Sequence, residues 1–211
     1  MVSPPKFEHL HIYSFAHFRN YLINNYLRPM LQINFTSFPV LATERLILRQ
    51  FRPEDMDALY EMRSNTEVMN LIRREPAKSK ADAAVIIKKI NDEFAANNAI
   101  TWAISMKGSP ELIGTIGFWR IEKENYRAEI GYMLHPNQHQ QGIMHEAMQV
   151  ALDYAFYVLG LHSVEAWINP INTASRRLVE KNGFVQEAYY RENVFFDGRF
   201  QDSVVYSLLK G

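Results

Sequence analysis

The 211-residue chain contains no cysteine, which excludes disulfides, cysteine nucleophiles and cysteine-based zinc sites. It has no excess charge of either sign, because 23 basic residues balance 23 acidic residues. A neutral total gives no electrostatic reason to expect binding to nucleic acid or to an anionic membrane. The sequence also lacks an apolar run of about 18 residues, as a transmembrane helix needs. Its first residues lack the basic start and apolar core of a signal peptide. We therefore expect a cytoplasmic protein.

Hydrophobic residues make up 47% of the chain, which is enough to build a buried core. We expect one domain over residues 41–211 and a helical N-terminal extension over residues 1–40. The extension is rich in aromatic residues and prolines, and its apolar spacing predicts a helix from about residue 14 to residue 27. That helix could pack on its own domain or act as a lid or dimer element. The sequence leaves these alternatives, and therefore a homodimer, open.

Hydrophobic periodicity and turn residues predict the element order β-α-α-β-β-β-α-β-α-β-β over residues 41–211. Ser79 is expected to cap the second helix and Asn172 the last one. Gly160 and Gly183 are expected to end two of the helices. Strands and helices mixed in this way predict an α+β fold without internal repeats.

Gly142 lies between a polar loop and a long amphipathic segment. The N-terminus of a helix has free N–H groups and a partial positive charge, so it suits a phosphate. A residue without a Cβ lets the backbone approach such a group closely. An ordinary loop glycine is the alternative.

Two carboxylates fall within apolar strands, Glu129 and Glu165. Strand alternation places Glu129 on the same face as Gly131 and Met133. A carboxylate in a central strand is costly unless it is paired or used, and burial can raise its pKa enough to make it a base near neutral pH. For Glu129 the sequence leaves a base and an ion pair equally open, and for Glu165 it favours an ion pair.

Two further groups of polar residues have simple structural explanations. Asn172 and Ser175 are three residues apart, which fits helix capping, although the same groups could face a ligand. The histidines show no metal-binding spacing, so we expect no metal site.

Together, the element order and four segments resemble the GNAT superfamily of acyl-CoA N-acyltransferases. The segments are "AEIGYMLHP", "QHQQGIMHEA", "NPINTASRRLVEKNGF" and "YYRENVFFDGRFQDSVVYSLL". The resemblance covers about residues 41–211 and is closest to the branch that includes the ribosomal-protein-alanine N-acetyltransferases. It implies a three-layer α/β arrangement with helices on both faces of a mixed, mostly antiparallel sheet. The sheet would be splayed between its fourth and fifth strands, and acetyl-CoA would enter that wedge.

The resemblance also implies which residues bind the acetyl-CoA donor. The pantetheine arm would lie along the strand that ends at Leu134, and the pyrophosphate would lie on the loop around Gly142. Against the family pattern Gln/Arg-x-x-Gly-x-Gly/Ala, this chain keeps the central glycine but has His139 first and Met144 last. The implied donor-binding residues are Met133, Leu134, His139, Gln140, Gln141, Gly142, Ile143, Met144, Asn172 and Ser175.

The implied reaction is acetyl transfer to a primary amine, either a protein N-terminus or a small molecule. Attack on a thioester needs a base for the amine proton, a donor to the carbonyl oxygen and an acid for the departing thiolate. We assign Glu129 as the base, the amide near Met133 as the donor, and Ser175 as the acid with Tyr190 as the runner-up. A non-catalytic acyl-CoA-binding or regulatory module is the alternative.

Overall fold

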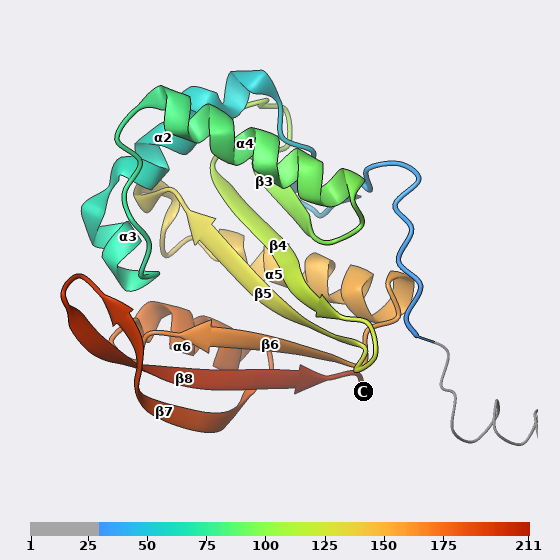
Figure 1. Ribbon diagram of the computed structural model, residues 1–211. Coiled ribbons are helices and arrows are strands. Elements are labelled where there is room, and N and C mark those ends of the chain that lie inside the picture. Colours follow the sequence, from blue (N-terminus) through green and yellow to red (C-terminus); the bar gives the residue numbers. More distant parts are fainter. Residues whose placement is uncertain (1–29) are drawn as a thin grey trace, which may run out of the picture. The chain divides into compact units, whose positions relative to one another are not determined.

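The computed structural model describes residues 30–211 (Figure 1). The helix predicted near residues 14–27 lies outside the described residues, as does most of the predicted extension. Leu31–Gly211 form one compact unit. None of the helices within residues 30–211 could span a membrane.

A single mixed sheet of eight strands organises this unit. The strands are β1 (Leu41–Ala42), β2 (Leu46–Arg49), β3 (Ile100–Met106), β4 (Gly114–Glu122), β5 (Arg127–Leu134), β6 (Ser163–Ile168), β7 (Val185–Phe196) and β8 (Arg199–Leu209). Their order across the sheet is β1-β2-β3-β4-β5-β6-β8-β7. All neighbours are antiparallel except β5 and β6, which are parallel.

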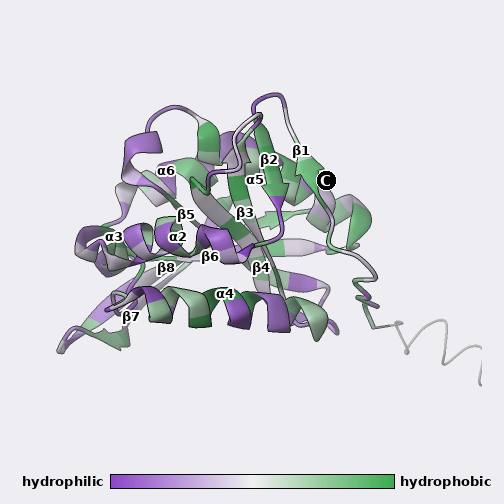
Figure 2. Ribbon diagram, turned by 90° about the horizontal axis from the view of Figure 1, so that it is seen from above, coloured by the Kyte–Doolittle hydropathy of each residue, from purple (hydrophilic) through white to green (hydrophobic). Residues whose placement is uncertain are grey.

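Helices cover both faces of the sheet, so the predicted three-layer α/β arrangement is confirmed (Figure 2). The helical segments are η1 (Pro53–Asp55), α2 (Met56–Ser64), α3 (Thr66–Leu71), α4 (Lys80–Ala95), η2 (Pro136–Gln138), α5 (Ile143–Asp153), η3 (Tyr154–Val158) and α6 (Thr173–Lys181). α4 lies on one face, and α5 and α6 lie on the other (Figures 1 and 2). Each layer buries its own apolar cluster against the sheet, one on the α5 side and one with α2 and α4.

The helix boundaries follow local capping rules. The side chains of Ser79 and Asp82 form a reciprocal capping box at the start of α4. The Asn172 side chain accepts a hydrogen bond from the Ser175 backbone at the start of α6. The structure adds elements to the predicted order. The short strand β1 precedes the first predicted strand, the segment between the first two predicted helices contains the extra helix α3, and the end of the α5 segment continues as the π-helical η3.

The sheet opens between β5 and β6. Only three residue pairs join these strands, from Arg127–Ser163 to Glu129–Glu165, and the strands then diverge. On its other side, β5 stays paired with β4 as far as Leu134. The predicted splay between the fourth and fifth predicted strands is therefore confirmed, and β5 has a free edge from Ile130 onward among the described residues.

The segment before β1 packs into the same core. Leu31 and Ile33 are buried, and the Phe35 ring stacks on Phe94 with centroids 4.9 Å apart. The Trp102 indole donates a hydrogen bond to the Pro39 carbonyl. This part of the predicted extension thus belongs to the compact unit.

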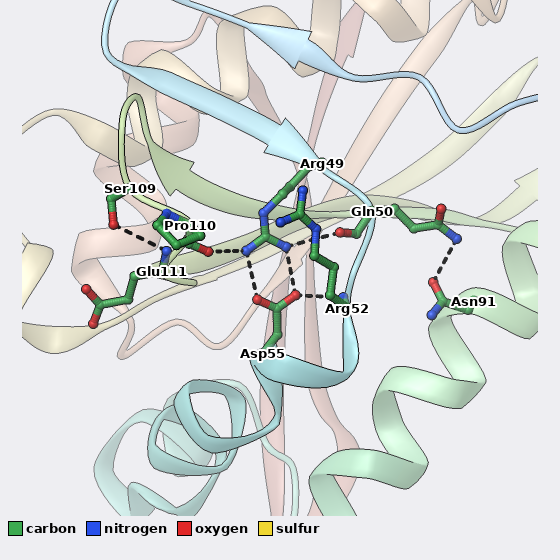
Figure 3. Close-up of polar contacts among 8 residues, drawn as sticks. All are labelled: Arg49, Gln50, Arg52, Asp55, Asn91, Ser109, Pro110 and Glu111. Carbon is green, nitrogen blue, oxygen red and sulfur yellow. Dashed lines mark hydrogen bonds and ion pairs between the residues drawn. The ribbon is translucent and has the colours of Figure 1, made fainter.

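A buried ion pair fixes the start of α2 to the sheet (Figure 3). Arg49 at the end of β2 donates from both terminal nitrogens to Asp55, at 2.7 Å each. The same guanidinium donates to the carbonyls of Gln50 and Pro110. The Asp55 carboxylate also accepts from the Arg52 backbone N–H. The terminal nitrogens of Arg49 and the carboxylate of Asp55 are therefore paired, as buried charges must be, and only Arg49 Nε has no hydrogen-bond partner.

Candidate functional site

A cavity of about 680 Å³ lies where the sheet opens. The free part of β5 and the diverging β6 line it, together with α2, α4, β4 and the start of α6. This volume falls within the range of about 300–1,000 Å³ that is typical of small-molecule sites. Glu129, Met133, Asn172 and Ser175, which were predicted from separate segments, all line this one cavity.

Glu129 is buried at the mouth of the splay, with 10% of its side chain exposed. Its carboxylate accepts a 2.8 Å hydrogen bond from Arg120. Burial raises the pKa of Glu129 above its ordinary value, and the nearby Glu165 adds to this effect. Arg120 and a hydrogen bond from the Trp119 side chain oppose it. Glu129 is therefore ion-paired and its pKa is raised, so the ion pair is observed and the role of base stays a prediction.

Glu165 has the structural role that its sequence context favoured. Its carboxylate accepts a 3.0 Å hydrogen bond from the Trp167 indole and lies 3.7 Å from Arg127 Nε. It faces Glu129 across the last β5–β6 pair.

Ser175 has a partner that sequence reasoning missed. The hydroxyl oxygens of Tyr132 and Ser175 are 2.6 Å apart, and either can be the donor. Burial raises the pKa of Tyr132 to about 12. This phenol therefore stays protonated near neutral pH and can donate to Ser175. Because Asn172 holds the Ser175 backbone at 3.1 Å, the serine is fixed from two sides.

Tyr190, the runner-up acid, and its neighbour Tyr189 lie on β7. The Tyr190 ring stacks on Trp167 with centroids 5.3 Å apart and is 46% exposed. Tyr189 donates to the Asp202 carboxylate. Neither is among the residues that line the cavity around Ser175.

A contact between Trp119 and Gly131 shapes the cavity wall. A Cβ added to Gly131 would lie 1.7 Å from a ring carbon of Trp119, so the indole occupies the space that a side chain would need. Both residues line the cavity. Strand alternation placed Gly131 on the same face as Glu129 but did not predict its contact with Trp119.

The loop at the start of α5 has an unusual backbone. Gly142 has a φ of +75°, and Gln140 also has a positive φ. A Cβ on Gly142 would have only Arg45 Nη2 within 4 Å, at 3.7 Å, so backbone conformation and not crowding within the chain favours glycine. Arg45 donates to the Gln141 carbonyl and pairs with Glu146, which braces the loop.

The two departures from the family pattern have separate structural contexts. Met144 is 7% exposed and Ile143 is 1% exposed, so both side chains lie in the core. The larger side chain of Met144 is therefore buried in the core and not on the exposed surface of the loop. His139 is exposed, and its Nε2 lies 3.1 Å from the Leu134 carbonyl. Among the described residues, no cluster of histidine and carboxylate side chains could hold a metal ion.

Comparison with known proteins agrees with this geometry. Residues 45–185 match the acetyltransferase (GNAT) domain family. The chain is 36% identical over 173 residues to the uncharacterised N-acetyltransferase YoaA of Bacillus subtilis, covering 82% of this chain and 98% of that protein. It is 39% identical over 170 residues to the uncharacterised N-acetyltransferase p20 of Bacillus licheniformis, covering 81% and 96%. A GNAT-family acetyltransferase structure from Bacillus anthracis superposes with a TM-score of 0.73 at 27% identity, covering 81% and 98%.

The fold and the splayed sheet thus define an acetyltransferase of the acyl-CoA-dependent class. The chain belongs to the GNAT family, and the predicted family, fold and enzyme class are confirmed. It is an N-acetyltransferase with acetyl-CoA as the acetyl donor.

Proposed function

We propose that the chain acetylates a primary amine within the splay cavity, with Glu129 as the base and Ser175 as the acid. The observation that carries this proposal is the shared cavity, since one space is lined by a buried carboxylate of raised pKa and by a hydroxyl fixed through a second hydroxyl. The amine nitrogen attacks the thioester carbonyl, a C–N bond forms and the C–S bond breaks. Glu129 accepts the proton that the amine loses, directly or through water.

Ser175 donates the proton that the departing thiolate takes up. We assign the protonated Tyr132 as the donor to Ser175 Oγ, an arrangement that leaves the serine proton free to move to sulfur. The same hydrogen bond stabilises the serine oxygen as it gives up that proton. Tyr190 remains the runner-up acid, and Tyr190→Phe is the matched comparison for Tyr132→Phe and Ser175→Ala.

The residues around the splay fit the acetyl-CoA donor. The pantetheine arm would follow the free edge of β5 along Met133 and Leu134, where β6 has diverged. The amide near Met133 would donate to the carbonyl oxygen as it gains negative charge. The pyrophosphate would lie on the backbone from His139 to Met144, where Gly142 presents no Cβ. Asn172 would contribute at the pantetheine end.

Gly142→Asn tests the donor site better than a β-branched replacement does. Any other side chain is strained at a φ of +75°, but asparagine tolerates this conformation well. The variant should therefore fold, and the added side chain should raise the KM for acetyl-CoA with little change in kcat. An unaltered KM would leave the glycine as a purely conformational residue.

The direct test measures thiol release from acetyl-CoA with a panel of amines, including peptides that begin with Ala or Ser. Glu129→Gln should lower kcat by about 10²–10⁴-fold and remove the acid limb of its pH profile. Glu124→Gln, an exposed turn residue, is the control. A pH–rate profile that Glu129→Gln leaves unchanged would remove Glu129 from this role.

A non-catalytic acyl-CoA-binding module is the second candidate, and it predicts coenzyme A binding without thiol release. The departures from the family pattern at His139 and Met144 are the features that favour it. Burial of the Met144 side chain weakens that support, because the bulk lies away from the loop surface.

Among the relatives, one of 25% identity is a spermidine N(1)-acetyltransferase and one of 24% identity is a ribosomal protein uS5-alanine N-acetyltransferase. Both a small amine and a protein N-terminus therefore belong in the panel. A homodimer and a cytoplasmic location remain predictions. Light scattering of the whole chain against a chain that starts at Met30 tests the first.

A further inference from the structure

The splay cavity is positively charged although the chain as a whole is neutral. Eight charged residues line it, and only two of these, Glu93 and Glu129, are acidic. The basic residues are Arg63, Arg73, Arg74, Lys89, Arg120 and Lys123. Since Arg120 pairs with Glu129, most of the remaining charge lies on the α2–α3–α4 side of the cavity.

Three of these arginines lack an acidic partner among the described residues. Arg63 Nε is buried without a hydrogen-bond partner. Burial lowers the pKa of Arg63 below its ordinary value, and the neighbouring Arg74 lowers it further. Arg73 donates only to neutral oxygens, the Asp202 carbonyl at 2.8 Å and the Ser203 hydroxyl at 3.0 Å. The nearby Asp202 carboxylate already accepts from Tyr189 and from the Glu192 backbone.

This arrangement is unfavourable for the protein alone. A half-buried guanidinium without an anion loses hydration, and a second guanidinium nearby repels it. An anion bound between them would relieve both effects. Guanidinium groups match carboxylate and phosphate groups with paired hydrogen bonds, so these are the anions that the site favours.

The arginines lie apart from the expected phosphate site of the donor. The loop from His139 to Met144 is not among the residues that line the cavity, whereas Glu129 and Ser175 are. The residues expected to hold the pantetheine end of the donor line the same cavity from β5 and the start of α6, whereas the unpaired arginines come from α2 and the segment after α3. We therefore assign the side of the arginines to the acceptor. Glu129 favours the amine of that acceptor, and the arginines favour a negatively charged group on it.

We propose that the acceptor is a small amine that also carries an acidic group, a carboxylate or a phosphate, which Arg63, Arg73 and Arg74 recognise. This inference rests on the proposed function, since it names the substrate class of the same site. Polyamines are disfavoured, because their second cation would face the arginines.

The test uses the full chain and acceptors matched except for charge. Thiol release from acetyl-CoA is compared for glutamate against glutamine, and for phosphoethanolamine against ethanolamine, with spermidine as the cationic amine. We expect kcat/KM to be higher for one or both acids than for their neutral partners, and the two pairs separate a carboxylate preference from a phosphate preference. Arg63→Gln and Arg74→Gln should each lower kcat/KM for the preferred acid by roughly 10- to 100-fold.

Two controls separate recognition from a general loss of charge. Arg63→Lys keeps the positive charge but lacks the paired N–H donors of a guanidinium. It should therefore retain part of the acid preference that Arg63→Gln loses. Lys107→Gln removes an exposed positive charge from the turn between β3 and β4, outside the cavity, and should leave kcat/KM unchanged.

A binding measurement keeps the inference separate from turnover. With saturating coenzyme A, the preferred acid should raise the melting temperature of the wild type but not that of the Arg63→Gln/Arg74→Gln double variant. Acid-specific stabilisation without thiol release from any amine would overturn the proposed function and retain anion recognition. The inference would be overturned if the acids and their neutral partners gave equal responses in both measurements. A higher kcat/KM for spermidine or a peptide than for the small acids would also overturn it.

Discussion

Arg49 and the arginines of the splay cavity have opposite surroundings. Arg49 is buried at the end of β2, and its two terminal nitrogens meet both oxygens of Asp55 (Figure 3). Arg63, Arg73 and Arg74 line the splay cavity and have no acidic partner among the described residues. Burial without a partner lowers the pKa of Arg63. Arg49 holds the fold together, whereas the unpaired group of Arg63, Arg73 and Arg74 is arranged at a cost to stability that a bound anion would offset.

Removing Asp55 should produce the largest change, because it turns Arg49 into a member of the unpaired group. Asp55→Ala leaves a guanidinium that is 7% exposed without its anion, and we expect a loss of about 3–5 kcal/mol in the free energy of unfolding. Urea denaturation measures it. The double variant Arg49→Met/Asp55→Leu should recover most of the loss, since no charge is left buried. A loss below about 1 kcal/mol in Asp55→Ala would show that Arg49 does not need its partner.

Arg120 stands between Arg49 and the unpaired group, because its buried partner Glu129 faces the cavity while 68% of its own side chain is exposed. Arg120 lowers the pKa of Glu129, which burial has raised. Arg120→Gln should therefore raise that pKa further. Catalysis needs the carboxylate, so activity is lost as the pH falls through this pKa, and the acid limb of kcat should move to higher pH. Lys107→Gln is the control, and an acid limb that stays in place would contradict the assignment.

Arg63→Gln should show the stability cost of the unpaired group. Removing a half-buried charge that has no anion should raise the free energy of unfolding by about 1 kcal/mol or less. For a domain of this size, 1 kcal/mol corresponds to a rise in melting temperature of roughly 2–4 °C, which is the upper limit of the expected change. Thermal unfolding without ligand measures it, with Arg63→Lys as the charge-preserving control. A lower melting temperature would place Arg63 with Arg49, as a residue that holds the fold.

The sequence predicted what depends on neighbours along the chain. Ser79 and Asn172 cap their helices as expected, because capping joins residues only three apart. The splay followed from the family resemblance. The hydrogen bond between Tyr132 and Ser175 joins residues 43 positions apart, so only the fold could show it. The family pattern likewise could not show that Met144 lies in the core.

The charges on the acceptor side of the cavity likewise could not be predicted from the sequence. In the sequence, the segment around Arg73 and Arg74 mixes acids and bases and selects no substrate charge. In the fold, the cavity collects Arg63, Arg73 and Arg74, while Glu75 between α3 and α4 is not among its lining residues. Folding thus separates the basic from the acidic side chains of this segment. The order of residues in the sequence does not show which of them line the cavity.

The smallest effect belongs to an ion pair whose distance is as short as that of Arg49 and Asp55. Lys88 Nζ lies 2.6 Å from Asp92 on α4, but these side chains are 76% and 61% exposed. Water screens such a pair, so Lys88→Gln should change the free energy of unfolding by no more than about 0.5 kcal/mol. Urea denaturation of the Lys88→Gln and Asp55→Ala variants under the same conditions gives the two free energies of unfolding for direct comparison. If the Lys88→Gln loss approached that of Asp55→Ala, the distance between the charges and not their burial would set the strength of these pairs. The burial of Arg63 without an acidic partner would then be no reason to expect a bound anion there.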